Sequence, residues 1–289
     1  MLNEFKVVQP TTVEEASTAL TEFGENAKIY AGGAELLLLM RHGLMQTEVL
    51  IDVKKIERLK GVTHNGNGLR AGACVTHREL AINPAVRQDA PALALAESQV
   101  ANVRVRNQGT LGGNLCFNDP HSDPGTVLLI HDATVTLGSR RGERKLPLGQ
   151  FYVDMYATAL EPDELLLEVN FASLPAGTNS AYVRLHRYQR PTLGAAAATR
   201  VKNDTFEEAR LAVGCVGPKA QRLAELEQKI IGTKPREARG IIADATNYLR
   251  DLLKPVDDLL GSADYKLYMT GVLLGDAVEQ SADKNGRTA

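Results

Sequence analysis

Apolar residues recur at helical or strand spacing along most of the first half of the chain. Residues 11–24 open with two threonines, carry glutamates in the first turn and end at Gly24, which predicts a helix. The run 77–103 has helical spacing and is interrupted near Pro84 and Pro91. Short strands, rich in β-branched residues or ending in glycine turns, are predicted at 27–33, 48–56 and 68–77, with one or two helical turns at 34–43.

The second half repeats this mixture of elements. Residues 124–148 predict a helix, a strand, a turn at 140–143 and a returning strand, and 164–173 predict a further strand. The segment "LPAGTNS" (174–180) has the composition of a linker. Beyond it we expect a second sheet from 180–188, 193–201 and 205–217, and helices at 220–232, 235–253 and 263–282.

Composition narrows the class of protein. The 289 residues exceed the size of most single cores, and 44% hydrophobic with 24% charged residues is an ordinary globular balance. A net charge of −2 argues against nucleic-acid binding. No run approaches the ~20 apolar residues of a membrane span, and residues 1–10 lack a signal-peptide core, so we expect a cytoplasmic protein. Three widely spaced cysteines predict neither disulfides nor a metal cluster.

Two glycine-bearing stretches lie about eighty residues apart, "IYAGGAELLLLMRHG" (29–43) and "RNQGTLGGNLCFNDPHSDP" (106–124). Glycines between a strand and a helix permit positive φ angles and close approach of a ligand. Exposed amides in such a turn can bind an anion such as a diphosphate. The alternative is a pair of ordinary tight turns. Neither stretch matches G-x-G-x-x-G or the P-loop pattern.

The same stretches resemble the FAD-binding medium subunits of molybdenum-containing hydroxylases, a family that includes carbon monoxide dehydrogenase, quinoline oxidoreductase and the middle part of xanthine dehydrogenase. "YAGGAELL" is similar to the family's first flavin loop, and "RNQGTLGGN" matches its pattern R-N-x-G-T-[IL]-G-G-N almost completely. The resemblance extends over essentially the whole chain. It implies an α+β fold, with a two-part FAD-binding domain of the vanillyl-alcohol oxidase type over 1–174 (parts 1–55 and 56–174) and a smaller α+β domain over 175–289.

The resemblance also implies the flavin site. Two phosphate-cradling loops would close on one FAD diphosphate through their main-chain amides. The first loop comprises Ala31, Gly32, Gly33, Ala34 and Glu35, and the second comprises Thr110, Leu111, Gly112, Gly113 and Asn114.

Two charged residues have a functional and a structural interpretation. Asp123 matches a family carboxylate that would accept hydrogen bonds from ribityl or ribose hydroxyls, or else it caps the helix beginning at Pro124. Asp119 has the same two interpretations. Arg184 matches a cation near the flavin ring, where it would stabilise reduced flavin, or else it is a solvated surface residue. Weaker candidates are Thr76, His77, Cys116 and His121.

One segment departs from the family. Many relatives carry Gly-Asp-Tyr after the basic stretch, with the tyrosine over the flavin ring, whereas this chain has "RPTLG" with Thr192 or Leu193 at that position. How the ring is covered is therefore open.

The function implied by the resemblance is electron transfer. FAD, bound noncovalently, would pass electrons from [2Fe–2S] clusters to NAD, a quinone or oxygen. Substrate hydroxylation would occur at a molybdopterin cofactor on a large partner subunit, and a small subunit would carry two [2Fe–2S] clusters, the whole forming a dimer of heterotrimers. This chain has no cluster-binding cysteine run, and we expect no catalytic or metal-binding residue on it. The alternatives are a self-sufficient flavin oxidoreductase and an assembly module without flavin.

Overall fold

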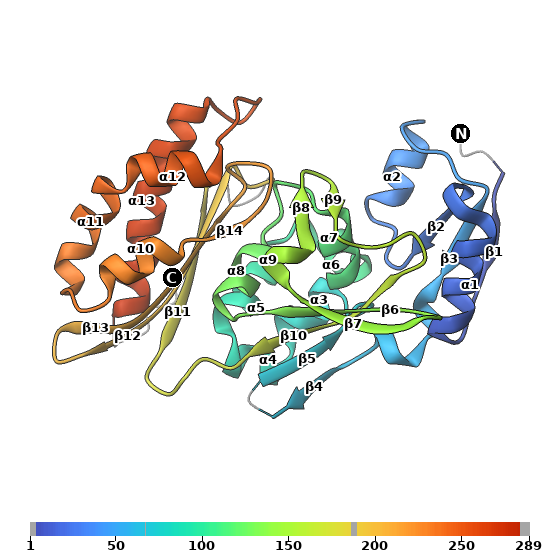
Figure 1. Cartoon of the computed structure of the whole chain (residues 1–289), viewed down its shortest axis with the longest axis horizontal. Coiled ribbons are helices and arrows are strands. Elements are labelled where there is room, and N and C mark those ends of the chain that lie inside the picture. The colour runs from blue at the N-terminus through green and yellow to red at the C-terminus, as the bar shows by residue number, and fades with distance from the viewer. Residues whose placement is uncertain (1–3, 67, 186–189, 284–289) are drawn as a thin grey trace.

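The computed structural model describes residues 4–66, 68–185 and 190–283. An N-terminal lobe, at one end of Figure 1, contains a three-stranded parallel sheet in the order β1-β3-β2. The central strand β3 is buried along its whole length, as expected for a strand covered on both faces. The elements of this lobe are β1 (Lys6–Val8), α1 (Val13–Phe23), η1 (Gly24–Asn26), β2 (Ala27–Tyr30), α2 (Leu36–Arg41), β3 (Val49–Asp52), η2 (Val53–Lys55) and η3 (Glu57–Leu59).

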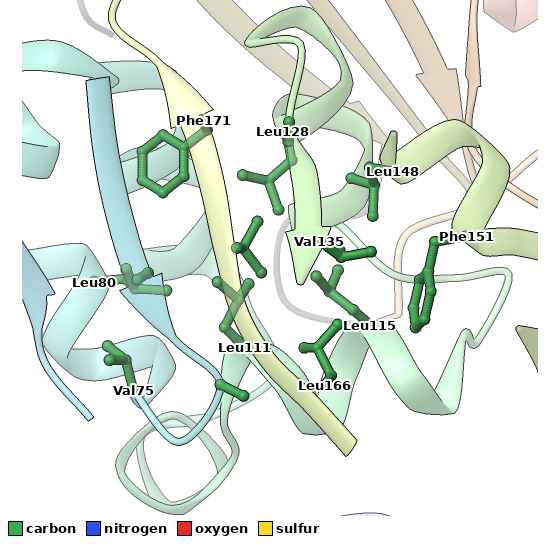
Figure 2. Close-up of a cluster of buried hydrophobic side chains, with 14 of the residues drawn as sticks. Val75, Leu80, Leu111, Leu115, Leu128, Val135, Leu148, Phe151, Leu166 and Phe171 are labelled. Carbon is green, nitrogen blue, oxygen red and sulfur yellow. The ribbon is translucent and has the colours of Figure 1, made fainter. Parts of the chain in front are cut away.

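A central lobe follows, built on a five-stranded antiparallel sheet in the order β4-β5-β10-β6-β7. Its core gathers apolar side chains from the sheet and from the helices beside it; Figure 2 shows Leu111 and Leu115 there together with Val135 and Leu166. The elements are β4 (Val62–Asn65), β5 (Gly68–Gly72), α3 (His77–Ile82), α4 (Pro84–Asp89), α5 (Pro91–Gln99), α6 (Val103–Gln108), α7 (Leu111–Phe117), α8 (Pro124–Ile130), β6 (Thr134–Ser139), β7 (Gly142–Pro147), α9 (Leu148–Phe151), β8 (Tyr152–Asp154), β9 (Ala157–Thr158) and β10 (Leu165–Ala172).

The C-terminal domain is a four-stranded antiparallel sheet, β11-β12-β13-β14, with helices α10–α13 on one face. Its other face packs on α5 and α8 of the central lobe. A separate apolar core lies between the sheet and its own helices. The elements are β11 (Asn179–Leu185), β12 (Leu193–Lys202), β13 (Thr205–Gly214), β14 (Gln221–Arg222), α10 (Ala224–Ile230), η4 (Pro235–Glu237), α11 (Ala238–Asp244), α12 (Thr246–Leu253) and α13 (Ala263–Ala282).

The α+β class is confirmed, as are the predicted strands and helices that flank the glycine-bearing stretches. The second of these stretches differs from the prediction. It is not a simple turn, because α6 and α7 occupy most of it, and Thr110 caps α7 by accepting a hydrogen bond from Gly113 N at 3.1 Å. The structure adds β4, which was not predicted, and the expected linker is shorter, since β11 begins at Asn179. Residues 186–188 of the predicted strand lie outside the described residues.

Within the described ranges, no helix combines the length and apolarity needed to cross a bilayer.

Candidate functional site

A cavity of about 620 Å³ lies where the N-terminal lobe, the central lobe and the C-terminal domain meet. The loop after β2 and the start of α7 form two of its walls, and Arg190 and Pro191 reach it from the C-terminal domain. A deep, partly apolar cavity between lobes is the usual setting of a cofactor site.

The first loop offers free main-chain donors to this cavity. Gly33 has a φ of +70°, which turns the chain sharply between β2 and α2. Among the residues that the structure describes, the N–H groups of positions 32–36 donate to no acceptor. Consecutive unpaired amides around a left-handed residue form a nest for an anion. We call residues 32–36 the amide nest.

A cation holds the base of this loop. Lys54 Nζ donates to Ala31 O at 3.2 Å, lies 3.8 Å from the centre of the Tyr30 ring and is 2.7 Å from Asp52 Oδ1. The contacts fix the end of β2, from which the amide nest starts.

The two glycine-bearing stretches touch each other at Gly32. A Cβ on Gly32 would lie 2.1 Å from the Gln108 carbonyl oxygen and 2.9 Å from Gly109 Cα. Only glycine permits this approach, because the opposing atoms belong to the backbone.

The amides of the second stretch, unlike those of the amide nest, have partners within the protein, and the binding of a diphosphate by this stretch stays a prediction. The amide N–H groups at the start of α7 are already paired within the protein. Leu111 and Gly112 donate to Val75 O and Ala73 O, both at 2.9 Å, Gly113 donates to Thr110 Oγ1 at 3.1 Å, and Asn114 donates to Thr110 O at 2.9 Å.

The two glycines of α7 have different surroundings. A Cβ on Gly112 would lie 2.6 Å from Ala73 Cβ, so this glycine allows α7 to pack on the chain after β5. Apart from the backbone of its own helix, Thr110 Oγ1 is the one described atom that a Cβ on Gly113 would approach within 4 Å, at 2.9 Å. Gly113 also lines the cavity. Its missing side chain therefore leaves space in the cavity rather than in the protein core.

Asp123 is buried at the boundary with the C-terminal domain and does not cap α8. Its carboxylate accepts hydrogen bonds from the Tyr182 hydroxyl and from Arg184 Nη1, the latter at 3.1 Å. Burial raises the pKa of Asp123 to about 6, and the Arg184 guanidinium opposes that rise. The capping interpretation is wrong, because the side chain turns to β11 instead.

Arg184 is not a solvated surface residue. Its side chain is 3% exposed, and Nη1 also donates to Gln99 O at 2.8 Å. Arg184 lies behind Asp123 and is not among the described residues that line the cavity.

Ion pairs cross one edge of the cavity. Arg190 Nη1 lies 2.5 Å from Asp119 Oδ2, and Nη2 lies 3.4 Å from Glu35 Oε1. One arginine of the C-terminal domain thus contacts both glycine-bearing stretches. Asp119 also accepts the His121 N–H at 2.9 Å.

The aromatic side chain expected near residue 192 has no counterpart there, since Thr192 and Leu193 are fully buried. Phe117, at the end of α7, lines the cavity instead. Its ring packs edge-on against Tyr156, with centroids 5.2 Å apart. An aromatic residue on the cavity wall therefore comes from another element.

The weaker candidates divide into two groups. His77, Cys116 and His121 line the cavity, whereas Thr76 caps α3 by accepting a hydrogen bond from Glu79 N. Burial raises the pKa of Cys116 to about 12, so its thiol stays protonated and unreactive at neutral pH.

Most of the residues predicted for the site lie on the cavity wall, and two do not. Leu111 points into the core (Figure 2) and Arg184 lies behind Asp123. Lining residues that the sequence did not indicate include Val105, Phe117 and Arg190, because nothing local distinguishes them from packing or surface residues. The predicted residues on the wall are Ala31, Gly32, Gly33, Ala34, Glu35, Thr110, Gly112, Gly113, Asn114 and Asp123.

An amide nest at a cavity between lobes, with further glycines in the cavity wall, is typical of proteins that bind a dinucleotide cofactor. Comparisons with known proteins specify the class. Residues 3–173 match the model of the FAD binding domain in molybdopterin dehydrogenase, and residues 182–281 match that of the CO dehydrogenase flavoprotein C-terminal domain. The chain belongs to the family of FAD-binding medium subunits of molybdenum hydroxylases.

Individual relatives are similar to this chain over nearly its full length. The carbon monoxide dehydrogenase medium chain of Hydrogenophaga pseudoflava is 32% identical, with 95% of this chain and 96% of the relative covered. A carbon monoxide dehydrogenase structure from the same organism superposes with a TM-score of 0.92 at 31% identity, covering 97% of this chain and 98% of that one. Quinoline 2-oxidoreductase from Pseudomonas putida 86 gives 0.90 at 25% identity, covering 99% of both chains.

Proposed function

We propose that this chain binds FAD noncovalently in the cavity and relays electrons from the [2Fe–2S] clusters of a partner subunit to NAD, a quinone or oxygen. The observation that carries the proposal is the amide nest, whose five N–H groups have no described partner and face a cavity of about 620 Å³. Bound flavin supplies the conversion between two-electron and one-electron transfer.

The residues fit a dinucleotide. The amide nest would hold the diphosphate, and Gly113 would leave room for it on the facing wall. Thr110 and Asn114 would border the same position. Asp123, held by Tyr182 and Arg184, would accept hydrogen bonds from hydroxyl groups of the flavin side chain.

The domain division that we propose is 1–174 and 175–289, with the first domain divided near residue 55. The end of β10 at Ala172 and the start of β11 at Asn179 support the main boundary. The end of η2 at Lys55 supports the division between the two sheets of the FAD-binding part.

The proposed assembly is a cytoplasmic dimer of heterotrimers. A large subunit would hold the molybdopterin cofactor, and a small subunit would hold two [2Fe–2S] clusters. The medium-chain designation of the Hydrogenophaga relative supports partners of two other sizes.

Purification of the chain with its partners tests the flavin assignment. We expect a visible flavin spectrum and release of one FAD per chain on acid treatment. A colourless chain with intact secondary structure would support the flavin-free module instead. Turnover of an organic substrate by the isolated chain would support the self-sufficient oxidoreductase.

A further inference from the structure

A buried histidine–glutamate pair lies in the cavity wall and has no part in the function described so far. His77 begins α3, Glu97 lies in α5, and Nδ1 and Oε2 are 2.6 Å apart. The side chains are 3% and 0% exposed. A carboxylate so deeply buried is strongly destabilising unless a positive group compensates it.

His77 is the group that faces Glu97. Glu97 Oε1 is sealed from solvent and has no hydrogen-bond partner in the described part of the chain, so the imidazole is the one described partner of this carboxyl group. The contact occupies Nδ1 of the ring and leaves Nε2 for another group. An imidazole nitrogen that carries its hydrogen is a donor, so Nε2 can donate to an acceptor in the cavity.

His77 Nε2 opens toward the cavity. This nitrogen makes no hydrogen bond to a described residue. It is nevertheless accessible to solvent, whereas the unpartnered Nε2 of His131 is sealed from it. A Cβ on Gly109 would lie 3.0 Å from His77 Cδ2 and 3.3 Å from Nε2. Gly109 also contacts Gly32, so the imidazole and the amide nest flank the same residue.

The charges on the cavity wall favour a further hydrogen-bond donor at this place. The acidic lining residues outnumber the basic ones, and Arg190 is already paired with Asp119 and Glu35. A nest carries only partial charges, so a side-chain donor beside it would add to its attraction for a diphosphate. The described acids of the lining are Glu35, Asp119, Asp123 and Glu164, and the described bases besides the two histidines are Lys28 and Arg190.

We infer that His77 donates Nε2–H to an oxygen of the dinucleotide's diphosphate and that Glu97 is the positioning residue that fixes the ring through Nδ1. This inference rests on the proposed function, because it assigns a contact to the same bound FAD. It adds a side-chain donor that glycine patterns do not reveal.

The test measures Kd values of the full-length apoprotein for FAD, ADP and riboflavin, of which riboflavin lacks phosphate. We expect His77→Gln to weaken FAD and ADP binding by about 10- to 100-fold, as for loss of a hydrogen bond to a charged group. Riboflavin binding should change by less than about 2-fold, within the range of an unaffected site. His131→Gln, which removes a buried histidine outside the lining, is the matched control and should leave all three Kd values unchanged.

His77→Gln removes the one described hydrogen-bond partner of buried Glu97, so the same titrations are made with the double variant H77Q/E97Q. Its expected loss for FAD equals that of H77Q, because one coupled unit is removed in both. The inference would be overturned if a variant lost as much affinity for riboflavin as for FAD. It would also be overturned if both variants bound FAD as tightly as the wild type. Either result would leave the proposed function standing. Failure of the folded wild-type chain to bind FAD and ADP would overturn the proposed function as well.

Discussion

Replacement of Gly113 by valine should remove flavin while leaving the fold intact. The new Cβ would lie 2.9 Å from Thr110 Oγ1, and no other atom of the described residues beyond its own helix backbone lies within 4 Å, so the two methyl groups would extend into the cavity. The diphosphate would then be displaced from the amide nest on the facing wall.

The structure sets the magnitudes. Disturbance of the Thr110 cap costs about 1 kcal/mol of apoprotein stability, and valine recovers a few tenths relative to glycine within a helix. The net change corresponds to about 2 °C in the melting temperature. Displacement of a phosphate from two amides loses about 1.5–3 kcal/mol per hydrogen bond, or at least about 100-fold in FAD affinity.

Gly112→Val is the matched control. Its Cβ would lie 2.6 Å from Ala73 Cβ and 2.7 Å from Ala73 O. Overpacking of this kind costs about 1–3 kcal/mol, so the apoprotein itself should melt lower. The neighbouring substitutions thus separate a position that faces ligand from one that faces protein.

Two measurements decide the result: the melting temperature of the apoprotein and the Kd for FAD from flavin fluorescence. Gly113→Val with wild-type FAD affinity would refute the assignment of this wall to the ligand. An equal fall in apoprotein melting temperature for both variants would show that Gly113, like Gly112, is a packing residue.

Three further substitutions test how the site is held together. Gly32→Ala should destabilise the apoprotein by about 1–3 kcal/mol, because its Cβ would lie 2.1 Å from Gln108 O. Gly271→Ala in α13 is the control, since no described atom beyond its own helix backbone lies within 4 Å of the new Cβ. It should stabilise the apoprotein by about 0.5–1 kcal/mol. The pKa of Asp123, raised to about 6, means that its contribution to the free energy of unfolding is greatest when it is protonated and falls by about 2 kcal/mol as pH rises from 4 to 7. The difference in free energy of unfolding between wild type and Asp123→Asn, measured with urea, should therefore change between about pH 4 and 7. A difference that stays constant with pH would contradict the raised pKa of this buried carboxyl group. Arg190→Gln should speed FAD release by up to about 5-fold, as for loss of an exposed ion pair, and wild type should match the variant in about 1 M salt. Unchanged release in stopped-flow fluorescence at low salt would show that these ion pairs do not retain the cofactor.

Elements with strong local patterns were predictable from the sequence. α13 and the paired strands β12 and β13 follow directly from apolar spacing over ten or more residues. α7 was not predictable in this way, because two adjacent glycines are unfavourable within a helix. Thr110 at its start and Leu111 and Leu115 in the core stabilise it in spite of them.

Which residues of the predicted site bind the cofactor stays a prediction, but the structure shows which of its main-chain amides are free. Both glycine-bearing stretches line one cavity. Whether a main-chain amide there is free to bind a ligand depends on carbonyl groups that are distant in the sequence. Gly112 N pairs with Ala73 O, and Leu111 N pairs with Val75 O, more than thirty positions earlier in the chain. The same holds for Asp123 and Arg184, which are 61 residues apart. Patterns within a short window contain no information about these partners.

The cavity exists only because separate parts of the chain meet around it. Gly32 contacts Gln108 across the two lobes, while Tyr182 and Arg190 reach Asp123 and Asp119 from the C-terminal domain. Ion pairs at such a boundary contribute little net stability, because desolvation opposes their attraction. Their directional hydrogen bonds instead fix the relative position of the parts, and a cofactor held between those parts adds binding energy only when all of them are in place. Flavin binding and the arrangement of the three parts are therefore thermodynamically linked, so a substitution at any of these contacts lowers FAD affinity even where the side chain never touches the cofactor.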